Sequence, residues 1–168
     1  HRACQLLQPI VDAQLDHILL SRVLAMDETP IKAGKSKKRR GKMQQGYYWP
    51  LYGEDDEIVF TYANSRARYV IEDLLNDAFT GVLLSDGYKA YASYVAKTEG
   101  LIHAQCWAHT RRQFFEARDD EPAAVDACLE QIKGLYKVEE AIREQSLSGE
   151  TKRAYRLEHK RKWLNTCT

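Results

Sequence analysis

The sequence contains few of the features that mark secreted, membrane or nucleotide-binding proteins. It has only four cysteines, at positions 4, 106, 128 and 167, and their wide spacing does not suggest a disulfide framework. No apolar run approaches the roughly 20 residues that a membrane-spanning helix needs. Residues 1–10 lack the pattern of a secretory signal, and no glycine-rich phosphate loop, serine nucleophile elbow or dinucleotide fingerprint is present. These absences favour a cytoplasmic protein without a membrane partner.

Charge is concentrated in one segment of the chain. The 168 residues are 44% apolar and 29% charged, which is ordinary for a globular protein, and the net charge is only +1. Seven of the eleven residues from Lys32 to Lys42 are nevertheless basic, so the rest of the chain carries −6. A local basic run of this kind suits a phosphate backbone, and a solvated loop is the alternative.

The periodicity of apolar residues predicts a mixed α/β fold. We expect strands at about 22–33, 46–54, 58–62, 81–85 and 101–105. Helices are expected at about 9–20, 66–77, 88–97, 107–118, 122–149 and 150–163, the last two as a helical hairpin. Three successive strands joined by short links are followed by helices that alternate with strands. This order indicates a mixed β-sheet with helices on its faces. Pro50 lacks an N–H and should therefore lie at an edge or a bulge.

Two of the predicted strands end on an aspartate. "VLAMD" ends on Asp27 and "VLLSD" on Asp86. If these strands are neighbours, the two carboxylates lie side by side, where they repel each other unless a cation such as Mg²⁺ or Mn²⁺ separates them. The alternative is that each aspartate only starts a turn, since Asp and Gly both favour turns. In the metal-site interpretation, Gly87 lets the chain turn away at once and leaves the Asp86 carboxylate available to the ion. Glu28 should point to the opposite face from its neighbour Asp27.

Several longer segments carry a resemblance. "MDETPIK", a Lys/Arg-rich loop, "GYYWPLYG", "SRARYVIEDLL", "LLSDGYKAY" and "IHAQCWAHTRRQFFEA" occur in this order. Together, over roughly residues 23–149, they resemble the bacterial insertion-sequence sixty-six family of transposases. The resemblance implies an RNase H-like core at residues 22–119 between an N-terminal helix (1–21) and a helical insertion (120–168).

The resemblance also implies a chemistry. Asp27 and Asp86 would be the first two catalytic acids and would bind two Mg²⁺ or Mn²⁺ ions. The reaction would be phosphodiester hydrolysis and strand transfer on double-stranded DNA at the ends of the element, by an enzyme that acts as a homo-oligomer when complete. The residues expected to contact the DNA backbone are Lys35, Lys37, Lys38, Arg39 and Arg40.

The sequence departs from this pattern in one respect. The third acid of the family is a glutamate beyond the helical insertion, and the sequence ends at Thr168 before such a residue is reached. It also does not begin with Met, so we expect a piece of a longer reading frame or a truncated copy, inactive alone. Two alternatives remain: a nucleic-acid-binding remnant without catalysis, or an RNase H-like nuclease in which Glu116 completes the site. Glu116 could instead pair with Arg112 on the same helix face.

Three further groups of residues have two interpretations each. His103, Cys106 and His109 could bind zinc, but a structural zinc site needs four ligands and no second pair is visible. The aromatic residues of the second strand could stack on bases, although alternating aromatics in a strand favour a core; they are Tyr47, Tyr48, Trp49 and Tyr52. Two arginines, Arg111 and Arg112, could meet phosphate or pair with acidic neighbours.

Overall fold

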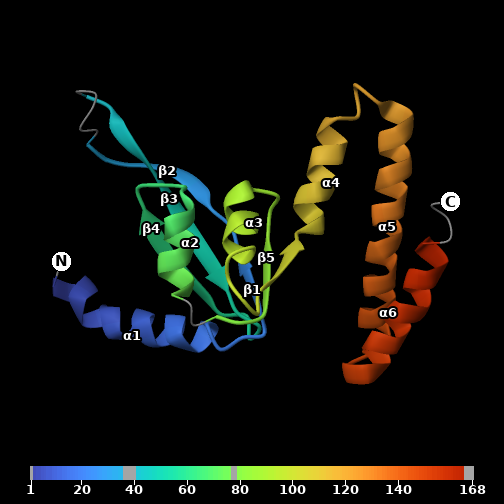
Figure 1. The fold of residues 1–168 in the computed structure, drawn as a ribbon, viewed down its shortest axis with the longest axis horizontal. Coiled ribbons are helices and arrows are strands. Elements are labelled where there is room, and N and C mark those ends of the chain that lie inside the picture. Colours follow the sequence, from blue (N-terminus) through green and yellow to red (C-terminus); the bar gives the residue numbers. More distant parts are fainter. Residues whose placement is uncertain (1, 36–40, 77–78, 165–168) are drawn as a thin grey trace. The chain divides into compact units, whose positions relative to one another are not determined.

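The computed structural model describes residues 2–35, 41–76 and 79–164, and the chain forms two compact units, residues 1–106 and 107–168 (Figure 1). The elements of the first unit are α1 (Arg2–Ile18), β1 (Val23–Met26), β2 (Thr29–Lys35), β3 (Met43–Tyr52), β4 (Ile58–Ala63), α2 (Arg68–Leu75), β5 (Val82–Ser85), α3 (Lys89–Val95) and β6 (Ile102–Gln105). The second unit consists of α4 (Trp107–Glu116), α5 (Pro122–Glu144) and α6 (Gly149–Leu164). The predicted α/β class is therefore confirmed.

The strands of the first unit form one mixed sheet. β5 lies between β1 and β6 and runs parallel to both. β3 runs antiparallel to β1 and β2, and also to β4. Since β1 and β5 are the strands that lead to the two aspartates, the expectation that these strands are neighbours is confirmed.

The single strand predicted at 22–33 is in fact two strands, β1 and β2, interrupted at Asp27 and Glu28. Both strands keep one register against β3, and this register places Asp27 opposite Pro50. The Pro50 carbonyl accepts the Asp27 N–H at 3.4 Å. Proline has no N–H to donate in return, so the regular ladder stops where the first aspartate is found. The expectation that Pro50 lies at an edge or a bulge is wrong, because β3 is paired on both sides and the register shift in this sheet lies between Ala33 and Lys35.

One face of the sheet is packed against helices α2 and α3 (Figure 1). The strand residues buried in this core are Leu24, Met26, Trp49, Leu51, Val59 and Leu83. The two helices contribute Val70, Ile71, Leu74, Leu75, Tyr91 and Tyr94. Alternate strand residues point away from this core. The architecture is therefore a sheet with a helix-covered face and a more open face.

The aromatic residues of β3 divide between these two faces. Trp49 is fully buried and Tyr47 is partly buried against the core, as the core interpretation predicts. Tyr48 and Tyr52 are 41% and 45% exposed, so that interpretation is wrong for them. The reason is the two-residue period of a strand, which turns neighbouring aromatics to opposite faces.

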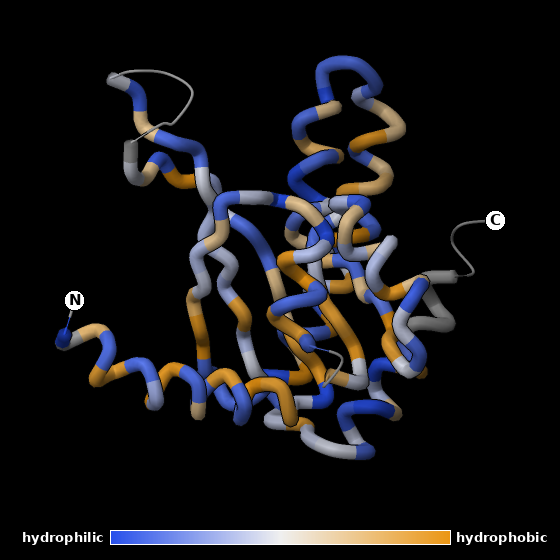
Figure 2. Tube along the Cα trace, turned by 60° about the vertical axis from the view of Figure 1, so that its left-hand side comes forward, coloured by the Kyte–Doolittle hydropathy of each residue, from blue (hydrophilic) through white to orange (hydrophobic). Residues whose placement is uncertain are grey.

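Helix α1 is longer than predicted. It begins at Arg2 rather than near residue 9, so Pro9 lies inside the helix and removes one backbone hydrogen bond. Leu15, Ile18 and Leu19 pack against the core, as their spacing predicts, but Ile10 is 64% exposed. Hydrophobic and hydrophilic residues alternate along this helix in Figure 2. Only its C-terminal part contributes to the core.

The second unit is helical. Val125, Ile132 and Ile142 of α5 are buried, whereas Phe115 of α4 is 54% exposed. Arg156 of α6 forms two hydrogen bonds of 2.6 and 2.7 Å with Glu139 of α5. These bonds lower the pKa of the Glu139 carboxyl. Within the described part of the chain, no helix is both long and apolar enough to cross a bilayer.

Gly81 is required where β5 begins, which leads to a prediction about stability. It has a φ of +154°, and an added Cβ would lie 2.4 Å from the Arg22 carbonyl oxygen, which accepts the Val82 N–H at 2.9 Å. We expect Gly81→Ala to lower the free energy of unfolding by about 2 kcal/mol or more, measured by urea denaturation. Gly87→Ala is the matched control, because its Cβ would meet no atom within 4 Å. Equal midpoints for the two variants would contradict the prediction.

Candidate metal site at the end of the sheet

Asp27 and Asp86 directly follow the paired residues of β1 and β5. The parallel register begins with Val23 beside Val82, an offset of 59 residues that also relates Asp27 to Asp86. Neighbouring strands lie about 4.8 Å apart, so the two aspartates leave adjacent strands at the same end of the sheet. Both residues are half-buried and therefore within reach of solvent ions.

The carboxylate of Asp86 shapes the turn that follows it. Its Oδ1 accepts the backbone N–H of Tyr88 at 2.8 Å, the pattern of an Asx turn. Gly87 is not among the glycines with positive φ, and a Cβ there would meet no atom within 4 Å. The backbone conformation therefore does not require glycine at this position, and the Asx turn is the one that the turn interpretation of Asp86 predicts. The other oxygen, Oδ2, lies 3.8 Å from Nη2 of Arg66.

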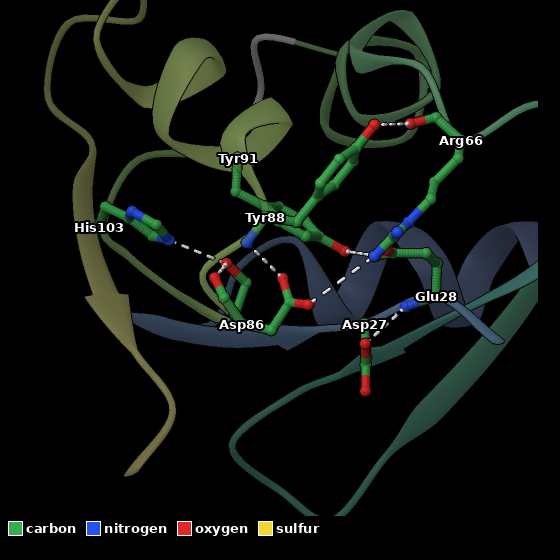
Figure 3. A network of polar contacts seen from close by, with 8 residues as sticks. Asp27, Glu28, Arg66, Asp86, Tyr88, Tyr91 and His103 are labelled. Atoms are coloured by element: carbon green, nitrogen blue, oxygen red, sulfur yellow. Dashed lines mark hydrogen bonds and ion pairs between the residues drawn. The ribbon is translucent and has the colours of Figure 1, made fainter. Parts of the chain in front are cut away.

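Asp27 and Glu28 point in different directions. Oδ1 of Asp27 accepts the backbone N–H of Glu28 at 2.8 Å. Figure 3 shows the Asp27 carboxylate directed away from the side chain of Glu28, which lies with Arg66 and Tyr91. This arrangement follows from the alternation of side chains along an extended chain, as predicted. Asp27 thus keeps its carboxylate outside the buried network.

Glu28 is a buried carboxylate with two partners. None of its side chain is exposed. The Tyr91 hydroxyl donates to its Oε2 at 2.5 Å, and the Arg66 guanidinium donates to its Oε1. Burial raises the pKa of Glu28, while the hydrogen bonds from Tyr91 and Arg66 oppose this rise. Burial, together with the Glu28 carboxylate, also raises the pKa of the Tyr91 hydroxyl, which keeps it a donor.

Arg66 connects the buried network to the proposed site. Its guanidinium binds Glu28, approaches Asp86 and lies 4.0 Å from the centre of the Tyr88 ring. The Tyr88 hydroxyl donates to the Arg66 carbonyl at 3.1 Å, so backbone and side chain are both held. Arg66 remains 41% exposed. No local sequence pattern points to Arg66 or Tyr91, because their partner Glu28 lies 38 and 63 residues away.

The predicted zinc ligands do not gather into a metal cluster. Nε2 of His103 lies 2.8 Å from Oγ of Ser85, which also donates to the Asp86 carbonyl at 3.1 Å. The Cys106 N–H donates to the Ser85 carbonyl at 2.8 Å. Among the residues that the structure describes, no three His, Cys, Asp or Glu side chains are positioned to hold a metal together. His103 instead supports the backbone next to Asp86.

The remaining candidate residues belong to other segments of the chain. Lys35 is the last residue of β2. The other predicted DNA contacts, Lys37, Lys38, Arg39 and Arg40, lie outside the described residues. Glu116 is an exposed residue of α4 in the second unit, and Arg111 and Arg112 are exposed on the same helix.

The aspartate pair fits a divalent cation by its chemistry. Two half-buried carboxylates at one end of the sheet supply the hard oxygen ligands that Mg²⁺ and Mn²⁺ prefer. Glu28 does not add a third ligand in this arrangement, because Tyr91 and Arg66 occupy both of its oxygens. Asp27 and Asp86 are therefore the residues that would hold the ion.

Comparison with known proteins identifies relatives. A sequence model described as "Transposase IS66 family" matches residues 1–168, the whole chain. Uncharacterized protein y4qI of Sinorhizobium fredii (strain NBRC 101917 / NGR234) is 28% identical over 156 residues, covering 82% of this chain and 28% of that protein. Uncharacterized protein y4hP of the same organism is 29% identical over 177 residues, covering 90% of this chain and 31% of that protein. The chain thus spans less than a third of the length of these relatives.

The Tyr91–Glu28 hydrogen bond leads to a second prediction. Tyr91 is fully buried, so Tyr91→Phe removes a donor from a carboxylate that water cannot reach. We expect the free energy of unfolding to fall by about 1–3 kcal/mol, measured by urea denaturation at neutral pH. Tyr62→Phe is the matched control, because that hydroxyl donates to Asn64 from an exposed position. A Tyr91→Phe effect no larger than that of the control would argue against a stabilising role for the bond.

Proposed function

The chain belongs to the transposase IS66 family, and we propose that residues 1–106 form part of the metal-dependent catalytic core of a DNA transposase. The observation that carries this proposal is the equal register of Asp27 and Asp86 at the ends of two adjacent parallel strands. The whole-chain family match supplies the reaction class. In this proposal the two aspartates are the first two acids of an Asp-Asp-Glu site.

The strand order supports an RNase H-like core. β1 and β2 share one register against β3, so together they take the place of a single first strand. The sheet then runs from β4 through β3 and β1 to β5 and β6, antiparallel in its first half and parallel in its second. Such a mixed sheet, with one aspartate on the first strand and one just after the fourth, resembles that fold. The resemblance predicts metal ligands at Asp27 and Asp86.

Asp27 and Asp86 would hold the divalent cation through their carboxylate oxygens. A bound Mg²⁺ or Mn²⁺ pair would stabilise charge on the phosphodiester oxygens and activate the attacking water or 3′-hydroxyl. The chain's own contribution is to position the carboxylates. The Tyr88 N–H orients Oδ1 of Asp86, and the Glu28 N–H orients Oδ1 of Asp27. Both bonds come from the backbone, so these orientations depend on the turns rather than on mobile side chains.

The substrate in this proposal is double-stranded DNA at the ends of the element and at the target. The basic segment between β2 and β3 carries the Lys/Arg residues predicted to contact the phosphate backbone. Residues Lys32–Lys42 carry seven positive charges whereas the rest of the chain is net acidic, so positive charge is locally concentrated in this segment. Hydrolysis at the element end and strand transfer into the target would follow at the metal site.

Metal binding tests the proposed site. We expect the protein to bind Mn²⁺, and Asp27→Asn and Asp86→Asn each to weaken binding roughly tenfold or more, because each removes one charged ligand. Isothermal titration calorimetry and the electron paramagnetic resonance signal of free Mn²⁺ measure this affinity. Asp73→Asn makes the same chemical change at an exposed position of α2 and should leave the affinity unchanged.

Two outcomes would count against the metal site. If the wild-type protein bound no Mn²⁺, or if Asp27→Asn bound it equally well, the aspartates would not be metal ligands. DNA binding retained under those conditions would favour a nucleic-acid-binding protein without catalysis.

The basic segment has its own test. We expect the double variant Lys38→Gln/Arg39→Gln to bind double-stranded DNA more weakly and to lower the slope of log K against log salt by about 1.8, for two lost phosphate contacts. This slope is negative, so the loss of two contacts reduces its magnitude, and fluorescence anisotropy over a salt series measures it. Lys97→Gln/Arg153→Gln is the matched control, because it removes one lysine and one arginine from exposed positions elsewhere. If both double variants changed the slope equally, DNA binding would depend on the net charge of the protein and not on contacts made by the basic segment.

A further inference from the structure

The proposed reaction gives no role to a buried ion pair beside its metal ligands. Glu28 is directly adjacent to Asp27 in sequence, and its side chain is fully buried. Burying a carboxylate is costly unless it is paired and hydrogen-bonded. Glu28 meets both conditions through Arg66 and Tyr91, which come from two different segments of the chain. Such a pair adds little stability over apolar packing, so its position calls for a separate explanation.

Arg66 lies between two carboxylates and binds them unequally. Its Nε and Nη2 both contact Oε1 of Glu28, whereas Nη2 lies 3.8 Å from Oδ2 of Asp86, beyond hydrogen-bond distance (Figure 3). The guanidinium also lies over the Tyr88 ring, 4.0 Å from its centre. The cation therefore approaches Asp86 but is held by Glu28.

We propose that Glu28 is a positioning residue that keeps the Arg66 cation away from Asp86, so that Asp86 stays available to a divalent metal. This inference rests on the metal site proposed above. A guanidinium and a metal ion compete for the same carboxylate, because each neutralises its charge. Glu28 compensates the positive charge of Arg66 from the buried side. Without that compensation, Arg66 would pair with Asp86 and would also repel the incoming ion.

Hydrogen bonds from neighbouring residues orient the carboxylates of Glu28 and Asp86 with respect to Arg66. Tyr91 donates to the second oxygen of Glu28 and so turns the first oxygen toward Arg66. Oδ1 of Asp86 is held by the Tyr88 N–H, which leaves Oδ2 as the oxygen that faces Arg66. Arg66 is 41% exposed, so its guanidinium has room to move toward Asp86 when Glu28 no longer binds it. The position of the Arg66 cation thus depends on Glu28, Tyr88 and Asp86, which lie around it, and on Tyr91, which orients Glu28.

The experiment measures Mn²⁺ affinity in a double-mutant cycle by isothermal titration calorimetry. We expect Glu28→Gln to weaken Mn²⁺ binding about tenfold, since the amide keeps the size of the side chain but does not neutralise Arg66. The double variant Glu28→Gln/Arg66→Gln should bind Mn²⁺ at least as tightly as the wild-type protein, because the competing cation is gone. Arg68→Gln/Glu72→Gln is the matched control: it removes a nearby ion pair of 2.8 Å within α2 and should change nothing.

Each outcome decides the proposal. If Glu28→Gln binds Mn²⁺ as tightly as the wild-type protein, the proposal is wrong. It is also wrong if Glu28→Gln binds Mn²⁺ weakly and the added Arg66→Gln substitution does not restore the affinity, because Glu28 would then have only a structural role. If Glu28→Gln does not fold, the double variant still decides, since it leaves no unpaired charge: binding weaker than wild type overturns the proposal. If Asp27→Asn leaves Mn²⁺ affinity unchanged, the metal site itself is wrong. If Asp27→Asn weakens Mn²⁺ binding but Glu28→Gln does not, the metal site stands and only the role of Glu28 is wrong.

Discussion

The parallel pairing of β1 with β5 is the constraint on which the candidate site depends. It places two aspartates that lie 59 residues apart at the same level of neighbouring strands. The first hydrogen bond of this pairing, from Val82 N–H to Arg22 O, needs a residue without a side chain at Gly81. A shift of one residue in this register would turn one aspartate to the other face of the sheet. The chemistry of the site is therefore coupled to backbone geometry several residues away.

The balance of charge at this end of the sheet depends on a single arginine. Three carboxylates, Asp27, Glu28 and Asp86, lie within a short stretch of two strand ends, and Arg66 contacts two of them. The buried carboxylate needs the cation most, because water cannot screen its charge. The two half-buried aspartates can be neutralised by ions from solvent. Burial thus separates a structural carboxylate from the two that the proposed function uses.

Much of the sheet could be predicted from local sequence, and the failures have identifiable causes. The apolar runs before Asp27 and Asp86 are strands, as expected. The break between β1 and β2 was not predicted, because it arises from Pro50 on the partner strand rather than from the residues of the first strand. The turn after Asp86 is formed by a local side-chain hydrogen bond to the Tyr88 N–H, as the turn interpretation of Asp86 predicts. The break after β1, by contrast, depends on a partner outside the local pattern.

The sequence by itself indicated that an apolar strand leads to each aspartate, although it did not place the end of the first strand at Asp27. It also determined that Glu28 points away from Asp27, since neighbouring residues of an extended chain alternate. Only the tertiary structure decided what Glu28 meets there. Arg66 and Tyr91 reach it from the segment before α2 and from α3, and no local periodicity encodes a hydrogen bond between such distant residues. Side-chain partners of this kind are selected by the packing of helices on the sheet, which exists only after the chain has folded.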